Sequence, residues 1–396
     1  MRIGMFSDTW LPTIDGVVTS LLPVRAELAR RGHEVYVFAP GDEEAIEANK
    51  NPNVILSKGR DFRAYPEYHI SLARMKIRKL VRERRVDIVH SHGVALMGMR
   101  AVWAARTNNL PLVFTYHTRV DEAAGYIARP GRPREIMRRL ITKHVNWYLR
   151  RCDVVIAPSR ATADHILETS GGNVRQMEVV PNGVDLTRFP ETPSKAILAR
   201  LGINEKTPTL LTVGRIAKEK SLETVIRSAP AILRNVPDAR FVIVGKGPAR
   251  EEVEKEVANA GLSDRFVFTG YLDDADVAGL YAHASAFLMP SRLETQGMVV
   301  LEAMRYGLVP VCADAGGVRD YVEHGRNGFL YAPGDSEALA EGVAKALAAG
   351  APVSQSARET ARRFSVEGAV DRLLALYGEA VAKGRGHSRL RAASKA

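Results

Sequence analysis

The sequence has little cysteine and no long apolar run, and both shortages narrow the class of protein it encodes. Only Cys152 and Cys312 occur among 396 residues, too few for a disulfide framework or a cysteine-rich metal site. No apolar stretch approaches the ~18–20 residues that a helix needs to cross a bilayer. The first residues also lack the long apolar segment and the small-residue cleavage site of a signal peptide. We therefore expect a cytoplasmic protein.

Glycine and proline are not enriched either. At 32 and 20 residues they are close to their average share, which excludes collagen-like and largely disordered chains. Hydrophobic residues make up 46% and charged residues 26%, the composition of a folded soluble protein. At ~100–200 residues per domain, the length favours two domains.

The positive charge is concentrated in one region. The net charge is +11, and residues 58–151 hold 21 Lys or Arg against 7 Asp or Glu, whereas the other residues hold 35 against 38. This one region of the first half therefore carries all of the excess positive charge. Such a region suits an anionic partner, either a phospholipid surface or nucleic acid. Solvated helix faces on a soluble protein are the alternative.

Short apolar segments alternate with helix-compatible segments in two series. The strands expected in the first series are 2–7, 34–40, 54–56, 86–90, 112–115 and 153–157. Those expected in the second are 209–213, 240–244, 266–268, 286–289 and 309–312. Nearly continuous apolar strands between helices indicate parallel sheets covered on both faces. We predict an α/β protein with two doubly wound, Rossmann-like domains and a ligand in the crevice between them, at the carboxyl ends of the strands.

The predicted domain boundaries follow these two series. A polar, proline-containing stretch separates the series and is therefore predicted to be a linker. The predicted parts are an N-terminal domain at 1–185, the linker at 186–208, a C-terminal domain at 209–365, a closing helix at 366–383 and a disordered basic tail at 384–396.

Two basic segments of the first half are predicted to be helices. In 70–85, four apolar residues at i, i+7, i+10 and i+11 share one helical face: Ile70, Ile77, Leu80 and Val81. The basic residues on the other sides include Arg74, Lys76, Arg78, Lys79 and Arg82. In 135–151, an apolar stripe is expected to pack on the sheet over most of its length: Met137, Leu140, Ile141 and Tyr148. Membrane contact would then come from the basic sides and from loops.

The most specific pattern lies in 290–304. Two carboxylates eight positions apart, Glu294 and Glu302, straddle Gly297 at the start of an apolar helix. Free backbone N–H groups at a helix N-terminus suit a diphosphate, and a carboxylate further on suits sugar or ribose hydroxyls. The alternative is an ordinary helix whose N-terminal acids are favoured by its dipole.

Two cations follow the first strand of the second series. Arg215 and Lys220 come after the 209–213 strand, at its carboxyl end, where cations neutralise a leaving diphosphate. A turn with a solvated base is the alternative, but this pattern and the carboxylate pattern would share one cleft.

Four segments together resemble the retaining glycosyltransferases of family 4, which have the GT-B fold. They are Gly214-Arg215…Lys220, Glu294-x7-Glu302, Pro-Asn-Gly-Val-Asp at 181–185 and Pro-Thr-Ile-Asp-Gly-Val at 12–17. The set in this order is highly specific, although no member is specific alone, and the resemblance covers roughly residues 1–380. It implies the GT-B architecture, with an acceptor-binding domain at 1–185 and a nucleotide-sugar-binding domain at 209–365. It also implies a nucleotide-sugar donor and front-face displacement, in which the leaving diphosphate accepts the proton of the acceptor.

The resemblance also implies roles for single residues. Gly16 would let the first loop approach the donor, while Arg215 and Lys220 would hold its diphosphate. Glu294 would bind the transferred sugar, and Glu302 would bind the ribose. The other implied donor-site residues are Tyr271 and Leu272 around the nucleobase, Thr295 and Gln296 before the helix, and Gly297 and Met298 with their backbone N–H groups.

Histidines and clustered acids raise the question of a metal. His117 follows the 112–115 strand, where the family has a histidine beside the sugar; without the resemblance, a simple polar contact would be the interpretation. His90 and His92 flank a similar strand end, but no carboxylate ligand is evident nearby, so we predict no metal. The acids of 273–276 precede a helix and are expected to cap it. No cofactor is predicted, because the nucleotide sugar is a substrate.

The opening residues 6–12 and 16–20 resemble in particular the bacterial diacylglycerol glucosyltransferases and their phosphatidylinositol mannosyltransferase relatives. This resemblance implies UDP-glucose, and next GDP-mannose, as the donor of a hexose. It implies a membrane lipid such as diacylglycerol or a phospholipid as the acceptor. We expect a peripheral location at the inner face of the cell membrane, because each basic residue near anionic headgroups adds ~1 kcal/mol of attraction.

Three alternatives stay open. A soluble glycosyltransferase that acts on a small sugar or sugar phosphate would use the same donor site. A nucleic-acid-binding module would use the basic region, but that region lacks interleaved aromatics and a known binding motif, so no nucleic acid is expected as a partner. A catalytically inactive nucleotide-sugar sensor would not need the complete set of two cations and two carboxylates.

Overall fold

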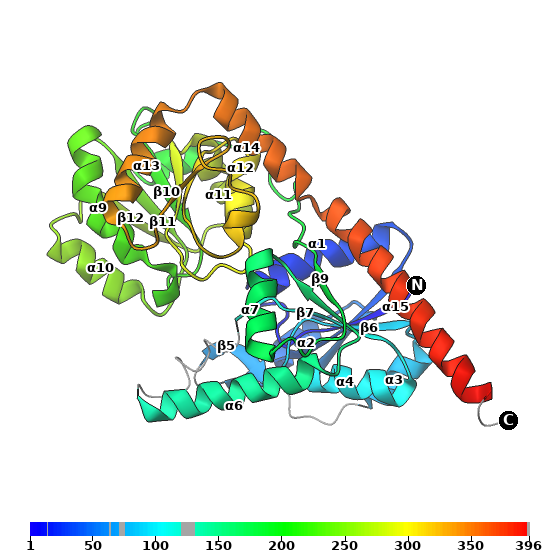
Figure 1. Cartoon of the computed structure of the whole chain (residues 1–396). Coiled ribbons are helices and arrows are strands. Elements are labelled where there is room, and N and C mark those ends of the chain that lie inside the picture. Colours follow the sequence, from blue (N-terminus) through cyan, green and yellow to red (C-terminus); the bar gives the residue numbers. More distant parts are fainter. Residues whose placement is uncertain (14, 63–64, 71–75, 120–130, 394–396) are drawn as a thin grey trace. The chain divides into compact units, whose positions relative to one another are not determined.

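The computed structural model describes residues 1–13, 15–62, 65–70, 76–119 and 131–393, and Figure 1 labels its elements. It divides into two compact units. Met1–Gly183 and Val366–Ala396 form the first unit, and Val184–Ser365 form the second. Each unit is built on one parallel sheet with helices on both faces. The prediction of an α/β protein with two doubly wound, Rossmann-like domains is confirmed.

The sheet of the first unit has seven parallel strands in the order β3-β2-β1-β6-β7-β8-β9. They are β1 (Arg2–Phe6), β2 (Glu34–Gly41), β3 (Val54–Lys58), β6 (Ile88–Ser91), β7 (Leu112–Thr115), β8 (Val154–Ala157) and β9 (Met177–Val179). The chain order reverses between β1 and β6. In sheets of this kind, ligands bind outside the carboxyl ends of the strands at such a switch point.

Two layers of helices cover this sheet (Figure 1). On one face lie α1 (Gly16–Arg30) and α15 (Val366–Ala393). On the other face lie α3 (Ile77–Glu83), α4 (Leu96–Asn108), α6 (Arg132–Leu149) and α7 (Arg160–Ser170). Strands such as β7 are buried at every position, because their side chains meet a helix layer on each face. The short helix α2 (Glu43–Ala48) follows β2.

The second unit repeats this plan with six parallel strands in the order β12-β11-β10-β13-β14-β15. They are β10 (Thr209–Val213), β11 (Arg240–Val244), β12 (Phe266–Gly270), β13 (Ala286–Met289), β14 (Pro310–Ala313) and β15 (Phe329–Tyr331). One face packs against α9 (Leu222–Asn235), α10 (Arg250–Asn259) and α13 (Ser336–Ala348). The other packs against α8 (Ala196–Arg200), α11 (Asp274–His283), α12 (Met298–Arg305) and α14 (Ala351–Arg363). The switch point lies between β10 and β13.

The structure places the boundaries of the units differently from the sequence prediction. The stretch 186–208 is no linker, because Phe189, Ile197 and Ile203 are buried in the core of the second unit. The helix predicted at 366–383 exists, but it belongs to the first unit, where Tyr377 is fully buried. It also continues to Ala393, through most of the tail that we expected to be disordered. Alanine, leucine and arginine in that segment have high helix propensity.

The basic segment 70–85 is only partly helical. Ile70 ends β5 (Tyr65–Ile70), which pairs with β4 (Arg60–Phe62) in an antiparallel hairpin, and α3 begins only at Ile77. The aromatic residues of β5 favour a strand over a helix. The helix predicted at 135–151 is present as α6. Within the part of the chain that the structure describes, no helix is long and apolar enough to span a bilayer.

Candidate functional site

In the second unit, close backbone packing positions Arg215 beyond the end of β10. The Ile216 N–H donates to the Lys246 carbonyl over 2.9 Å, which ties this loop to the loop after β11. Gly245 allows the two loops to touch, since a Cβ there would stand 1.9 Å from the Gly214 carbonyl oxygen. Arg215 itself lies 3.8 Å from Glu219 and is about one-third exposed. Its guanidinium is therefore held at the carboxyl end of the central strand.

Lys220 and Glu294 form the closest ion pair of the predicted site residues. Lys220 lies in the 3-10 turn Lys218–Lys220, and its Nζ donates to Glu294 Oε1 over 2.5 Å. The Glu294 side chain is 10% exposed, and the Lys220 side chain is 27% exposed. Because β10 and β13 are adjacent strands, the loops after them bring these two side chains together. The structure therefore joins the two patterns that the sequence showed separately.

The loop that carries Glu294 is held by backbone contacts. The Gly317 N–H donates to the Glu294 carbonyl over 2.8 Å, and a Cβ at Gly316 would stand 2.3 Å from that same oxygen. The Tyr321 hydroxyl lies 3.0 and 2.9 Å from the carbonyl oxygens of Gln296 and Gly297. Only glycine, which has no Cβ, allows the backbone at 316 to come so close to the Glu294 carbonyl. The loop after β14 therefore supports the loop that carries Glu294.

The N-terminus of α12 follows directly from this loop. Gly297 caps the helix with φ +80°, and Met298 is its first residue. The N–H groups of the first helical turn have no partner within a helix and carry the positive end of its dipole. Thr295 and Gln296 lie between Glu294 and this turn, and Gln296 is buried. The predicted backbone site for a diphosphate is thus adjacent to the Lys220–Glu294 pair.

Glu302 is the most buried of the four charged residues that were predicted to bind the donor. Its side chain on α12 is buried, and Tyr281 on α11 donates its hydroxyl to Glu302 Oε2 over 2.9 Å. Arg188 lies 3.8 Å from Glu302 Oε1 and also binds Asp274. Burial raises the pKa of the Glu302 carboxyl, and Arg188 partly opposes that shift. The residue predicted to bind ribose therefore already has two partners inside the unit.

The last two predicted donor residues follow β12. Tyr271 comes directly after Gly270, and its side chain is 60% exposed. Leu272 is half-buried and packs against the core of the second unit. Asp273 accepts a hydrogen bond from the Asp276 N–H over 2.9 Å, which confirms the predicted cap of the following helix.

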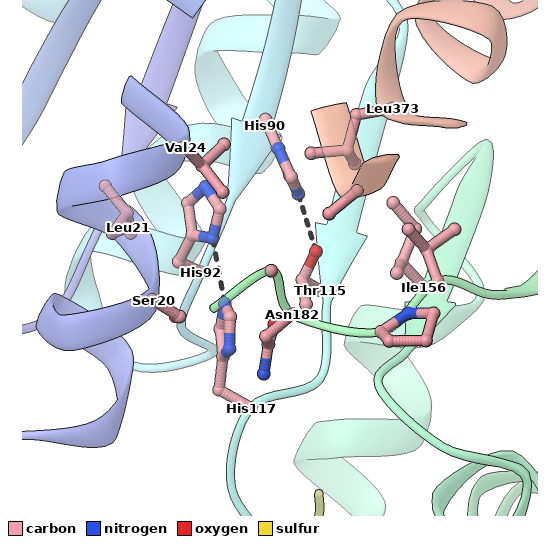
Figure 2. Close-up of a pocket in the computed structure, with 14 residues that line it drawn as sticks. Ser20, Leu21, Val24, His90, His92, Thr115, His117, Ile156, Asn182 and Leu373 are labelled. Atoms are coloured by element: carbon pink, nitrogen blue, oxygen red, sulfur yellow. Dashed lines mark hydrogen bonds between the residues drawn. The ribbon is translucent and has the colours of Figure 1, made fainter. Parts of the chain in front are cut away.

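In the first unit, His117 belongs to a cluster of three histidines at the ends of β6 and β7 (Figure 2). His92 Nδ1 and His117 Nε2 are 3.0 Å apart, and the centroids of the His90 and His92 rings are 4.0 Å apart, with the ring planes tilted by 43°. Burial lowers the pKa of His90 to about 3 and that of His117 to about 4. Burial also lowers the pKa of His92 well below its usual value. All three imidazoles are therefore neutral at pH 7.

These histidines line a pocket inside the first unit. Leu21 and Val24 of α1 and Leu373 of α15 form its apolar wall, and Asn182 lies close to His117. Thr115 closes the pocket at the strand end and bonds His90 Nε2 over 2.8 Å. The pocket thus combines an apolar wall with neutral hydrogen-bonding groups, as a site for hydroxyl-bearing ligands does.

Gly16 is the first residue of α1. Asp15 caps this helix by accepting a hydrogen bond from the Val18 N–H over 2.8 Å. A Cβ at Gly16 would meet no other atom of the described residues within 4 Å, so the space beside it is open. Gly16 follows the loop after β1, at the same sheet edge as the histidines.

The two basic helices differ in the side chains that they expose. On α3, the basic residues Lys76, Arg78, Lys79 and Arg82 are exposed, while Arg74 lies outside the described residues. On α6, the predicted apolar stripe packs on the sheet only in its second half, where Tyr148 is buried. Ile136 and Leu140 in the first half are 58% and 55% exposed, because the helix extends beyond the sheet there. Of the predicted stripe, Tyr148 is in the core and Ile141 packs against it, whereas Leu140 is exposed.

Sequence reasoning missed three residues that support the site. Arg188 and Tyr281 contact Glu302. In the sequence, only the position of Arg188 just after the 181–185 motif could have indicated that it belongs to the site. Asp8, after β1, accepts hydrogen bonds from the Ala95 and Met97 N–H groups, both at 2.8 Å, and so caps α4. Burial raises the pKa of Asp8. Among the residues that the structure describes, no three side chains of the metal-binding types are grouped as a metal site would need.

Comparison with known proteins agrees with this geometry. The family "Glycosyltransferase Family 4" matches residues 14–188, and the family "Glycosyl transferases group 1" matches residues 194–364. The alpha-monoglucosyldiacylglycerol synthase of Streptococcus pneumoniae is 29% identical over 320 residues, which cover 79% of this chain and 71% of that protein. The GDP-mannose-dependent alpha-mannosyltransferase of Mycolicibacterium smegmatis is 30% identical over 334 residues, which cover 83% and 84%.

A solved structure supports the fold. The structure of Anabaena HepE in complex with UDP-glucose superimposes with a TM-score of 0.72 at 21% identity, covering 96% of this chain and 100% of that one. At that identity the match shows the fold, which is that of the GT-B glycosyltransferases. Both halves of the sequence match one family each, and the family 4 resemblance is confirmed. The chain belongs to the GT-B glycosyltransferases, with a family 4 domain followed by a group 1 domain.

Proposed function

We propose that this glycosyltransferase moves a hexose, with retention of configuration, from a nucleotide-diphosphate sugar to a lipid at an anionic membrane surface. The observation that carries the donor half is the Lys220–Glu294 pair beside the N-terminus of α12. Cations and free N–H groups suit a diphosphate, and a carboxylate suits sugar hydroxyls. UDP-glucose is the first donor to test and GDP-mannose the second, following the names of the similar proteins.

In the proposed reaction, the protein mainly orients the substrates and stabilises charge. Negative charge grows on the diphosphate as the glycosidic bond breaks, and Arg215, Lys220 and the first turn of α12 receive it. The leaving diphosphate accepts the proton of the attacking hydroxyl on the same face of the sugar, so the configuration is retained. Glu294 holds the sugar during this step. A divalent metal is dispensable in this proposal, and activity that a chelator abolishes and Mg²⁺ restores would contradict it.

The surface of α6 supports a lipid acceptor. Ile136 and Leu140 are exposed in the first half of this helix, between the exposed basic residues Arg132, Arg134, Arg138, Arg139 and Lys143. Apolar side chains among cations are typical of helices that lie in a membrane interface. Helix α3, whose basic residues are exposed, covers the same face of the sheet as α6. A peripheral position on the inner face of the cell membrane follows.

A panel of donors and acceptors tests the proposal. UDP-glucose, UDP-galactose and GDP-mannose are each incubated with anionic vesicles that contain diacylglycerol, or with soluble sugars and sugar phosphates. We expect transfer to the vesicle lipid, fastest with UDP-glucose, and NMR of the product should show the anomeric configuration of the donor. Transfer to soluble acceptors alone would overturn the lipid assignment, and an inverted product would overturn retention.

A further inference from the structure

The three histidines of the first unit use their ring nitrogens unequally. His90 uses both nitrogens, because Nδ1 lies 2.5 Å from the Tyr377 hydroxyl and Nε2 lies 2.8 Å from Thr115 Oγ1. His92 and His117 share one hydrogen bond, from Nδ1 to Nε2 over 3.0 Å. Their other nitrogens, His92 Nε2 and His117 Nδ1, are buried and have no hydrogen-bond partner among the described residues. A buried polar atom without a partner is costly, so these two atoms point to a missing ligand.

The shared bond restricts the protons on this pair. Each ring is neutral, since burial lowers the pKa of both, and each therefore has one N–H and one lone pair. One of the two nitrogens in the bond must donate and the other must accept. The two unpartnered nitrogens are then also one donor and one acceptor. The hydrogen bond at one imidazole nitrogen thus decides what the other nitrogen offers a ligand.

We propose that His92 is a positioning residue for the transfer reaction. Through its Nδ1 it holds the ring and the tautomer of His117, so that His117 Nδ1 meets a substrate hydroxyl in the pocket of Figure 2. The His90 ring packs beside the His92 ring, with centroids 4.0 Å apart and planes tilted by 43°. This inference rests on the proposed function, since it assumes that a hydroxyl of a sugar or acceptor lies beside His117.

Two amide variants at one position test this role. The amide of His92→Asn lies about where Nδ1 was and can still bond His117 Nε2, whereas the longer His92→Gln places its amide about where Nε2 was. With UDP-glucose and diacylglycerol vesicles, His92→Gln should lower kcat on the order of 10- to 100-fold while His92→Asn stays within about threefold of wild type. Equal activities of the two variants would overturn the proposal. Tyr377→Phe, which loses only the bond to His90, is the matched control and should keep wild-type turnover.

A second measurement does not depend on turnover. In protein with ¹⁵N-labelled histidine, the wild type, His92→Asn and Tyr377→Phe should show one protonated and one unprotonated nitrogen for His117. In His92→Gln, these two signals should move toward each other as the tautomers exchange. An unchanged single tautomer in His92→Gln, or a mixed one in the wild type, would overturn the inference. Absence of transfer by the wild type would instead overturn the proposed function and leave this spectroscopic comparison in force.

Discussion

The two units differ in the charge of the side chains at the ends of their central strands. In the second unit, Arg215, Lys220 and Glu294 are ionic and partly exposed, with side chains between 10% and 36% accessible. In the first unit, His92 and His117 are neutral because they are buried. A diphosphate that gains charge needs cations, whereas a hydroxyl needs only a donor and an acceptor. In the function proposed above, the second unit would therefore bind the diphosphate and the first unit a hydroxyl.

Removal of the cations should have the largest effect. Arg215→Ala and Lys220→Ala should each lower kcat/KM ~10²-fold or more, because each charge stabilises the leaving diphosphate. Lys218→Ala is a matched control, since Lys218 lies in the same turn but pairs with the exposed Glu252. Steady-state kinetics with UDP-glucose measure the change. Wild-type rates in the Arg215 and Lys220 variants would remove both residues from the site.

Glu294→Gln should separate sugar binding from nucleotide binding. The amide keeps the shape but loses the charge-assisted contacts to sugar hydroxyls, so transfer should fall on the order of tenfold or more. Affinity for free UDP, measured by calorimetry, should change much less, because the proposed partner of Glu294 is the sugar. An equal loss of UDP affinity would show that Glu294 acts on the diphosphate through its bond to Lys220.

Acid should destabilise the first unit through its histidines. Their pKa values are near 6.5 in the unfolded chain, whereas burial lowers that of His90 to about 3 and that of His117 to about 4 in the fold. The unfolded state therefore binds more protons between pH 6.5 and about 4, and the free energy of unfolding falls as the pH drops through that window. Each of these histidines should remove about 2 kcal/mol between pH 6.5 and 5.

Tryptophan fluorescence can follow this loss in the full chain. Trp10, Trp103 and Trp147 are the three tryptophans, and all belong to the first unit. Urea unfolding by this signal should have a lower midpoint at pH 5.0 than at pH 7.5. Between pH 7.5 and 9, where the histidines stay neutral in both states, the midpoint should not change for this reason. The same midpoint at pH 5.0 and 7.5 would contradict buried, neutral histidines.

Charge reversal on α3 should weaken membrane binding. Glutamate at Arg78, Lys79 and Arg82 should reduce sedimentation with anionic vesicles several-fold at low salt, because each basic residue adds ~1 kcal/mol of attraction. The difference should shrink as salt shortens the Debye length from ~10 Å at 0.1 M. Hydrolysis of UDP-glucose in solution should survive, since the ionic site lies in the other unit.

A matched control carries the same charge change on the second unit. Lys206, Arg234 and Lys255 are also exposed, and their reversal to glutamate should leave vesicle binding unchanged. Equal losses in both variants would mean that net charge alone drives binding. No sedimentation of the wild type with anionic vesicles at low salt would favour the soluble-acceptor alternative.

Most strands and most site residues could be predicted because their signals are local. The runs at 112–115 and 286–289 are apolar throughout, and such runs indicate buried parallel strands. The three-residue edge strands β9 and β15 were missed because they are too short to show a pattern. The β4–β5 pair was not predicted, and only its last residue, Ile70, was assigned, to the helix expected at 70–85, because apolar periodicity alone does not separate helix from strand in short segments.

The sequence by itself determined the fold class, the family and the residue types of the candidate donor site, because strand–helix alternation and the motifs consist of residues that are close in sequence. Only the tertiary structure decided which distant residues meet. Lys220 and Glu294 are 74 positions apart and pair because β10 and β13 are adjacent. His92 and His117 likewise join across 25 positions, from the ends of β6 and β7. Burial then sets their protonation, and burial depends on how the whole chain packs rather than on any local pattern.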